Sequence, residues 1–345
     1  MRVGVGSRRR RPGKNIIIVV LFLLCVAAVG WYFLSERIVF TADGIKISFS
    51  DKKDEKEPTV PTEDITINIT ENESESEGET ESESQTEDEP DEETPVQLKA
   101  RWITAANLKN TAYVDSLISQ GVNQVVFTAK DTDGVVNIPF EFSAGNPNGL
   151  VSGDAQTVAE NLKKLNDNGI YTIATISVMR DAIMTRSYRA EAMSVNSGET
   201  WLDSNNIPWF VPASQTAMNY TKELISALEA LGVDEVMLTN FSYPTVGRTE
   251  LIKAEYAPSQ QVLTEAAKAF GDSSIPVGVL VSQNEKSGQN IAELEQYFDR
   301  MYVSGVYGGE AAAALETSLS QKDKLVCVVG PESECSEGVS CVYTQ

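Results

Sequence analysis

An alternation of short apolar runs with helix-like stretches, from residue 96 to residue 345, constrains the fold of this chain more than any other feature. Eight runs have the length and apolar content of buried strands; they lie at 98–105, 124–129, 171–178, 235–239, 277–281, 300–306, 324–329 and 339–343. Helices are predicted between them at 111–120, 154–168, 214–231, 260–270, 291–298 and 311–319. Eight strands with intervening helices in a domain of this size predict an α/β fold, a (β/α)8 TIM-like barrel.

An open, doubly wound parallel sheet is the alternative fold. Such a sheet usually has a glycine-rich phosphate loop after its first strand, and residues 105–110, AANLKN, do not form one. Two features depart from a regular barrel: the seventh connection has no clear helix, and none is predicted after the eighth strand. The barrel remains the favoured prediction.

The N-terminal region predicts a membrane anchor. Residues 16–34, IIIVVLFLLCVAAVGWYFL, carry no charge and are long enough to cross a bilayer. Arg8–Arg11 and Lys14 precede this segment, so the positive-inside rule places the N-terminus in the cytoplasm and the rest of the chain outside. A cleaved signal peptide shares the basic start, but the apolar run is longer than usual and residues 27–30, AAVG, make a poor cleavage site. We therefore expect a single-pass membrane protein with a retained helix.

A sharp change in composition separates the anchor from the barrel. Residues 51–95 hold nineteen acidic and three basic side chains, with almost no apolar ones after Ile69. Such a segment buries too little surface to offset its chain entropy, and its charges repel one another. The predicted organisation is a basic cytoplasmic tail at 1–15, a transmembrane helix at 16–34, a membrane-proximal segment at 35–50, a disordered acidic linker at 51–95 and the barrel at 96–345.

Composition also excludes several kinds of chemistry. The chain contains no histidine, which rules out a Ser-His-Asp triad and an HExxH zinc site. Acid–base work would fall to carboxylates, Lys, Tyr or Cys. The net charge of −22 argues against nucleic acid as a partner, because phosphate contacts need clustered Lys and Arg.

We expect no metal and no cofactor. Cys327, Cys335 and Cys341 lie beyond the membrane and lack the spacing of a zinc site. An oxidising exterior permits a bridge between Cys335 and Cys341 or between Cys327 and Cys335. A fully reduced state is a third possibility.

In barrels of this type the functional residues follow the carboxyl ends of the strands. Carboxylates for proton transfer and aromatic rings for stacking on sugars are what glycoside hydrolysis uses. The candidate catalytic residues are Asp131, Asp133, Asp181 and Glu285. The candidate substrate-binding residues are Lys130, Arg180, Trp201, Trp209, Asn240, Tyr243 and Tyr307.

Each of these motifs also has a structural interpretation. The sequence Asp131-Thr132-Asp133-Gly134 is typical of an ordinary turn. Arg180-Asp181 equally suits a structural ion pair. The pair of tryptophans in the third loop also suits a packed lid.

Four landmarks, taken together and in order, resemble a family. They are VVFTAKDTDG at 125–134, NLKKLNDNGIYTIATISVMRD at 161–181, W-L-D-(x)5-W-F-V-P at 201–212 and ALGVDEVMLTNFSYP at 230–244. The chain is similar over these residues to a bacterial family of glycosyl-hydrolase-like TIM barrels of unknown function, common in Gram-positive species. The resemblance implies a TIM barrel that acts on a polysaccharide or another glycan.

The chain departs from that family at acidic positions. Thr128, Val211 and Thr239 stand where members typically have Asp, and Ser242 stands where they have Arg. A threonine cannot act as a carboxylate nucleophile or general acid. The leading hypothesis is a membrane-tethered glycosidase acting on a cell-surface or cell-wall polysaccharide. The alternative is a catalytically degraded barrel that binds glycan or an envelope partner without turnover, and a third is a purely structural domain of the envelope.

Overall fold

The computed structural model describes residues 38–41, 44–47, 97–282, 284–304, 318–333, 335 and 338–344. The chain divides into two compact units, residues 1–86 and 87–345. In the first unit β1 (Ile38–Thr41) pairs with β2 (Gly44–Ile47) in an antiparallel hairpin. The predicted transmembrane helix at 16–34 and the linker at 51–95 lie outside the described residues. Within them, no helix combines the length and apolar character that crossing a bilayer requires.

The second unit is a closed barrel of eight parallel strands, which confirms the predicted architecture. Around the barrel the order is β10-β3-β4-β5-β6-β7-β8-β9. The strands are β3 (Lys99–Trp102), β4 (Gln124–Lys130), β5 (Tyr171–Ser177), β6 (Glu235–Thr239), β7 (Val277–Val281), β8 (Arg300–Ser304), β9 (Leu325–Val329) and β10 (Ser340–Tyr343). Because β10 pairs with both β9 and β3, the sheet has no free edge.

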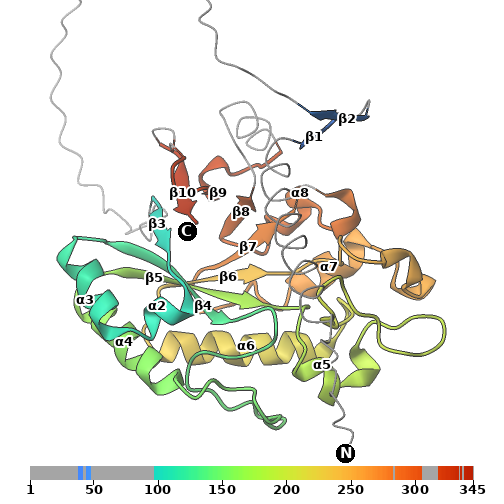
Figure 1. The fold of residues 1–345 in the computed structure, drawn as a ribbon, viewed down its shortest axis with the longest axis horizontal. Helices are drawn as coiled ribbons and strands as arrows, with labels where there is room; N and C mark the ends of the chain where they lie inside the picture. The colour runs from blue at the N-terminus through green and yellow to red at the C-terminus, as the bar shows by residue number, and fades with distance from the viewer. Residues whose placement is uncertain are drawn as a thin grey trace, which may run out of the picture. The chain divides into compact units, whose positions relative to one another are not determined.

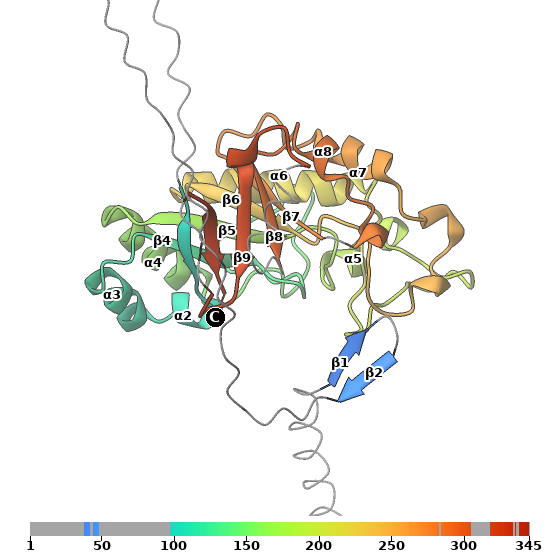
Figure 2. The ribbon, with the colours of Figure 1, turned by 90° about the horizontal axis from the view of Figure 1, so that it is seen from above.

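Helices lie between most of the consecutive strands and pack around the barrel (Figures 1 and 2). They are α2 (Ala105–Leu108), α3 (Thr111–Ser119), α4 (Ala155–Asp167), α5 (Met184–Ser187), α6 (Gln215–Ala230), α7 (Gln260–Ala267) and α8 (Ile291–Leu294). Asn110, Ser214 and Ser259 cap α3, α6 and α7 by accepting hydrogen bonds from first-turn N–H groups. The helix predicted at 311–319 lies almost entirely outside the described residues.

Two hydrophobic clusters hold the barrel together. One lies between the strands and the helices, and the other fills the interior. The interior cluster consists of Leu98, Ala100, Val126, Ile173, Met237, Tyr302, Val326, Val328 and Val342. Its members come from alternate positions of their strands, as the period of two along a strand requires.

A buried charged network lies at the amino ends of the strands. Glu235 accepts hydrogen bonds from Arg300 Nε at 3.0 Å and from the hydroxyls of Tyr171, at 2.9 Å, and Tyr302. Burial raises the pKa of Glu235, against the opposing effects of Arg300 and the two tyrosines. This network is at the end of the barrel opposite to the one where function is expected.

A disulfide links Cys335 to Cys341 and so ties the last connection to β10. Of the possibilities that the sequence left open, this is the pairing that forms. Cys327 is buried on β9.

Candidate functional site

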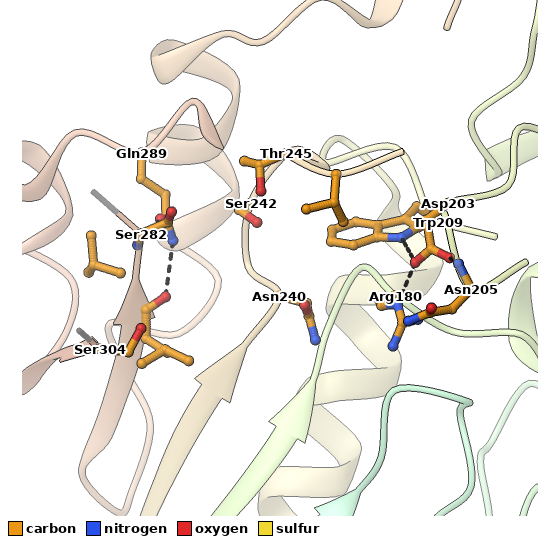
Figure 3. Close-up of a pocket in the computed structure, with 13 residues that line it drawn as sticks. Arg180, Asp203, Asn205, Trp209, Asn240, Ser242, Thr245, Ser282, Gln289 and Ser304 are labelled. Carbon is orange, nitrogen blue, oxygen red and sulfur yellow. Dashed lines mark hydrogen bonds and ion pairs between the residues drawn. The ribbon is translucent and has the colours of Figure 1, made fainter. Parts of the chain in front are cut away.

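A cavity of about 280 Å³ opens at the carboxyl ends of β5, β6, β7 and β8. Figure 3 shows the side chains that surround it. They are Arg180, Asp203, Asn205, Trp209, Asn240, Ser242, Thr245, Val246, Leu280, Val281, Ser282, Gln289 and Ser304. We refer to this space as the mouth cavity. Its position is where barrels of this type carry their active sites.

The turn after β6 directs two polar residues toward the mouth cavity. Asn240 has φ 51°, in the left-handed region that Asn tolerates better than most residues. Its Nδ2 donates to Ser177 Oγ at 3.0 Å, which ties the turn to the end of β5. Asn240 and Ser242 then line the cavity on this side (Figure 3).

Asp203 is the one carboxylate among the described residues of the cavity lining. Its Oδ2 accepts from Arg180 Nε at 2.6 Å and from Trp209 Nε1 at 3.1 Å. Its Oδ1 accepts from the N–H groups of Asn205 at 2.8 Å and Ile207 at 3.0 Å. Each oxygen therefore already accepts two hydrogen bonds. These bonds fix the loop in place.

These contacts also keep Asp203 ionised. Burial by itself raises the pKa of the carboxyl, but the four hydrogen bonds, that from Arg180 foremost, outweigh it and hold the pKa below its ordinary value. A general acid needs the opposite shift, toward neutral pH. Asp203 is consequently suited to orienting Arg180 and Trp209 rather than to transferring a proton.

Asp203 and Trp209 come from a hairpin-like loop between β5 and α6. Leu202 pairs with Pro208, and Trp209 pairs with Arg180, through isolated antiparallel bridges. Trp201 precedes this loop and is 2% exposed, and its indole N–H donates to the backbone carbonyl of Arg248. Both tryptophans pack in the core, since Trp209 is only 4% exposed, but one side of Trp209 lines the mouth cavity and Trp201 does not.

Asp181 pairs with Lys130 beneath the surface, and Arg180 pairs with Asp203, so the ion pair suggested between Arg180 and Asp181 does not form. Lys130 Nζ is 2.8 Å from Asp181 Oδ2, and the two side chains are 1% and 0% exposed. Lys130 Nζ also donates to the carbonyl of Ser177 and lies 5.3 Å from the centre of the Tyr220 ring. Neither Lys130 nor Asp181 lines the cavity, so the geometry favours a structural ion pair at this position.

The other predicted acids lie apart from the cavity. Asp131 accepts from the N–H groups of Asp133 and Val135, both at 2.9 Å, in the turn after β4, and Asp133 is exposed. Glu285 is exposed at the start of a short 3-10 helix (Glu285–Ser287). None of these three lines the cavity. Their catalytic roles stay predictions.

Of the predicted binding residues, Arg180, Trp209 and Asn240 meet at the mouth cavity. Tyr243 is 4% exposed and borders a different depression, beside Tyr256 and Lys286. Tyr307 lies outside the described residues. Three of the seven predicted binding residues thus surround one space.

The positions of the missing acids are informative. Val126 and Met237 belong to the interior cluster, so Thr128 and Thr239, each two residues further along, face the interior near the carboxyl end. Thr239 Oγ1 donates to the carbonyl of Ile176 at 3.3 Å. Val211, the third replaced position, instead packs against the outer hydrophobic cluster. Two hydroxyl groups therefore stand where the resemblance in sequence implies carboxylates.

Sequence reasoning missed several residues of the cavity. Asp203 belongs to the W-L-D landmark, but nothing in that motif indicates that its side chain reaches the cavity. Ser282, Gln289 and Ser304 carry no motif, and only the closure of the barrel brings them to the cavity. In the described part of the chain no group of three or more His, Cys, Asp or Glu side chains could hold a metal ion.

Solved structures that align with the chain include proteins from three organisms. A hypothetical protein from Ruminiclostridium thermocellum aligns with a TM-score of 0.47 and 18% identity, covering 52% of this chain and 95% of the other. A noncanonic maltogenic alpha-amylase, AmyB from Thermotoga neapolitana, aligns at 0.47 and 10% identity, covering 71% and 67%. An alpha-galactosidase from Lactobacillus brevis aligns at 0.46 and 8% identity, covering 72% and 37%. Similarity this low says nothing about activity.

No curated protein sequence shows significant similarity to the chain. A family described as "Putative glycosyl hydrolase domain" matches residues 100–305. That match spans more than half of the chain and runs from β3 to just beyond the end of β8. The chain is therefore a divergent member of this glycosyl hydrolase domain family.

Proposed function

We propose that this protein is a membrane-tethered, extracytoplasmic barrel that binds sugar units of a cell-surface or cell-wall polysaccharide in its mouth cavity without cleaving them. One observation carries the proposal. The carboxylate of the described cavity lining, Asp203, has both oxygens occupied by four donors. Among the described residues, the lining of this cavity can hold a sugar but supplies no pair of carboxyl groups for acid–base catalysis.

The cavity suits a neutral, hydroxyl-rich ligand. Asn205, Ser242 and Thr245 supply hydrogen-bonding groups, and Trp209, which is 4% exposed, adds a small aromatic contact. The charge of Arg180 is offset by Asp203. Polar groups converging on a small concave site are how proteins fix the orientation of such ligands.

Glycoside hydrolysis usually needs two carboxyl groups, about 5 to 9.5 Å apart across the scissile bond. Asp203 cannot supply a general acid, because its hydrogen bonds favour the ionised form. Thr128 and Thr239 offer only hydroxyls at the interior positions where the resemblance in sequence implies Asp. The described lining therefore supports binding without turnover.

The tether and the linker come from the sequence. The uncharged segment at 16–34 after a basic start supports membrane anchoring, and the acidic segment at 51–95 supports an extended spacer. A spacer of this kind would hold the barrel away from the bilayer, where wall or surface polysaccharide is found. The proposed polysaccharide target therefore depends on the proposed membrane anchor.

Hydrolysis is the second candidate, and family membership favours it. Its carboxylates would have to come from outside the described lining. Glu310 and Glu316 follow β8 in the sequence, and the end of β8 reaches the cavity at Ser304. These two acids are the first to test if turnover is found.

Binding is tested with the full-length chain in detergent micelles against a panel of bacterial wall and exopolysaccharides. The double variant Asn205→Ala/Ser242→Ala removes two hydrogen-bonding groups from the lining and should weaken binding about tenfold or more. Asn219→Ala/Ser119→Ala makes the same chemical change on exposed helical surfaces of α6 and α3 and should bind like the parent. Equal affinity of both variants for every glycan would contradict binding in the mouth cavity.

A further inference from the structure

We propose that a second hollow, next to the mouth cavity, binds the carboxylate groups of an anionic, uronate-containing polysaccharide. The hollow has a volume of about 900 Å³ and lies between α5, the loop at 199–208 and residues 253–256. It shares no residue with the mouth cavity. The inference rests on the proposed function, since it assumes that the barrel binds glycan.

The charge of the hollow is opposite to that of the domain around it. Arg186 on α5, Arg189 at the start of the 3-10 helix Arg189–Glu191, and Lys253 all line it. Residues 96–345 as a whole carry 29 acidic and 17 basic side chains. Three cations on one wall of an acidic domain make a local site for an anion.

The two arginines are available to a ligand. Both are exposed, and neither takes part in any of the ion pairs found within the described residues. Lys253 is 3.5 Å from Glu255, a long pair between partly exposed side chains. The acid on the lining itself is Glu199, which accepts a hydrogen bond from Ser197 Oγ at 3.3 Å. The net charge of the hollow therefore remains positive.

The shape and chemistry of the hollow favour a sugar acid over a bare anion. A guanidinium presents paired donors that match a carboxylate. Beside the arginines lie the half-buried ring of Tyr256 and the side chain of Leu202, which is 45% exposed. Apolar and aromatic surface of this kind packs against the C–H faces of a sugar ring.

One loop separates the two sites and so allows one polymer to occupy both. Leu202, Asn206 and Pro208 line the hollow, whereas Asp203 and Trp209 line the mouth cavity. The bridge between Leu202 and Pro208 gives this loop a two-faced, hairpin-like form. A chain of sugars that crosses the loop would place a neutral unit in the cavity and an acidic one in the hollow.

The test measures the affinity of the full-length chain in detergent micelles for polygalacturonate, a polymer with one carboxylate per sugar. Fully methyl-esterified polygalacturonate keeps the rings and removes the charge. Inorganic polyphosphate keeps a dense negative charge and has no rings. Arg186→Ser/Arg189→Ser is compared with Lys163→Ser/Lys322→Ser, which removes two exposed cations from outside the hollow.

We expect Arg186→Ser/Arg189→Ser to bind polygalacturonate about tenfold more weakly than the parent, and the control pair to bind like the parent. Added salt should weaken the parent's binding, because exposed charges are screened. Ester and polyphosphate should both bind more weakly than polygalacturonate. Equal loss in both double variants, or equally tight binding of polyphosphate, would overturn the inference, since either result indicates non-specific charge attraction.

The same experiment separates this inference from the proposed function. If neutral glycan still binds and Asn205→Ala/Ser242→Ala abolishes that binding, while Arg186→Ser/Arg189→Ser leaves polygalacturonate affinity unchanged, the hollow is not an anion site and the mouth cavity stands. If polygalacturonate does not bind while a neutral glycan of the panel does, only this inference fails; if no glycan in either experiment binds, both proposals fail.

Discussion

Asp203 joins three parts of the candidate site, because its carboxylate holds Arg180, Trp209 and its own loop together. Its side chain is 1% exposed and that of Arg180 is 11% exposed, so the pair is largely shielded from water. Removing one partner of a shielded pair leaves the other charge without compensation. We expect Asp203→Asn to lower the free energy of unfolding by about 3 kcal/mol, measured by denaturant titration, and to weaken glycan binding.

Asp167→Asn provides the matched control, because Asp167 pairs with Lys163 on the exposed face of α4. Asp167→Asn should lower the free energy of unfolding by about 0.5 kcal/mol or less. The depressed pKa of Asp203 adds a pH test. The stability that ionised Asp203 contributes is present above about pH 4 and is lost as pH falls through the lower folded-state pKa. The Asp203→Asn variant should not show this loss of stability. An Asp203→Asn protein as stable as the parent would contradict the role assigned to Asp203.

Some residues of the site were predictable from the sequence and others were not. Arg180, Trp209 and Asn240 follow strands or belong to a landmark, and they do reach the mouth cavity. Asp181 directly follows Arg180 but is buried, because neighbouring residues at a strand end point in different directions. The sequence order of polar residues at a strand end therefore locates a site without saying which side chains enter it.

At the scale of elements, the turn after β4 and the start of α5 are packed against each other. Gly134 has φ 97°, and a Cβ built there would lie 2.2 Å from Asp181 Oδ1. Gly134→Ala would displace the carboxylate that pairs with Lys130. We expect it to lower the free energy of unfolding by at least about 2 kcal/mol.

Gly153→Ala is the comparison, because a Cβ at Gly153 has no atom within 4 Å. Gly153→Ala should change the free energy of unfolding by no more than about 1 kcal/mol in either direction. Similar stability of the two alanine variants would argue against tight packing of Gly134 on Asp181.

The strands were the more predictable elements. All eight apolar runs became barrel strands, because buried parallel strands are apolar on both faces. Helix ends were less well predicted: the stretch at 291–298 yields a helix only at Ile291–Leu294. Polar residues in such a stretch are compatible with both a helix and a turn, and packing decides between them.

At the scale of the whole molecule, the proposed anchor predicts where the protein is found. The intact chain should remain in the membrane pellet after alkaline carbonate extraction, and deletion of residues 16–34 should move it to the soluble fraction. Deletion of residues 71–89, in the acidic segment, should leave it in the pellet. A mature protein whose N-terminus, determined by sequencing, begins after residue 30 would show a cleaved signal peptide instead.

The central claim is that the barrel holds a glycan without cleaving it. The most direct measurement is the release of reducing ends over time from a polysaccharide that the full-length chain is shown to bind, at protein concentrations that saturate binding. The account predicts no release above that of the polysaccharide alone. Release that rises with protein concentration and disappears in Asn205→Ala/Ser242→Ala would contradict it and establish hydrolysis at the mouth cavity.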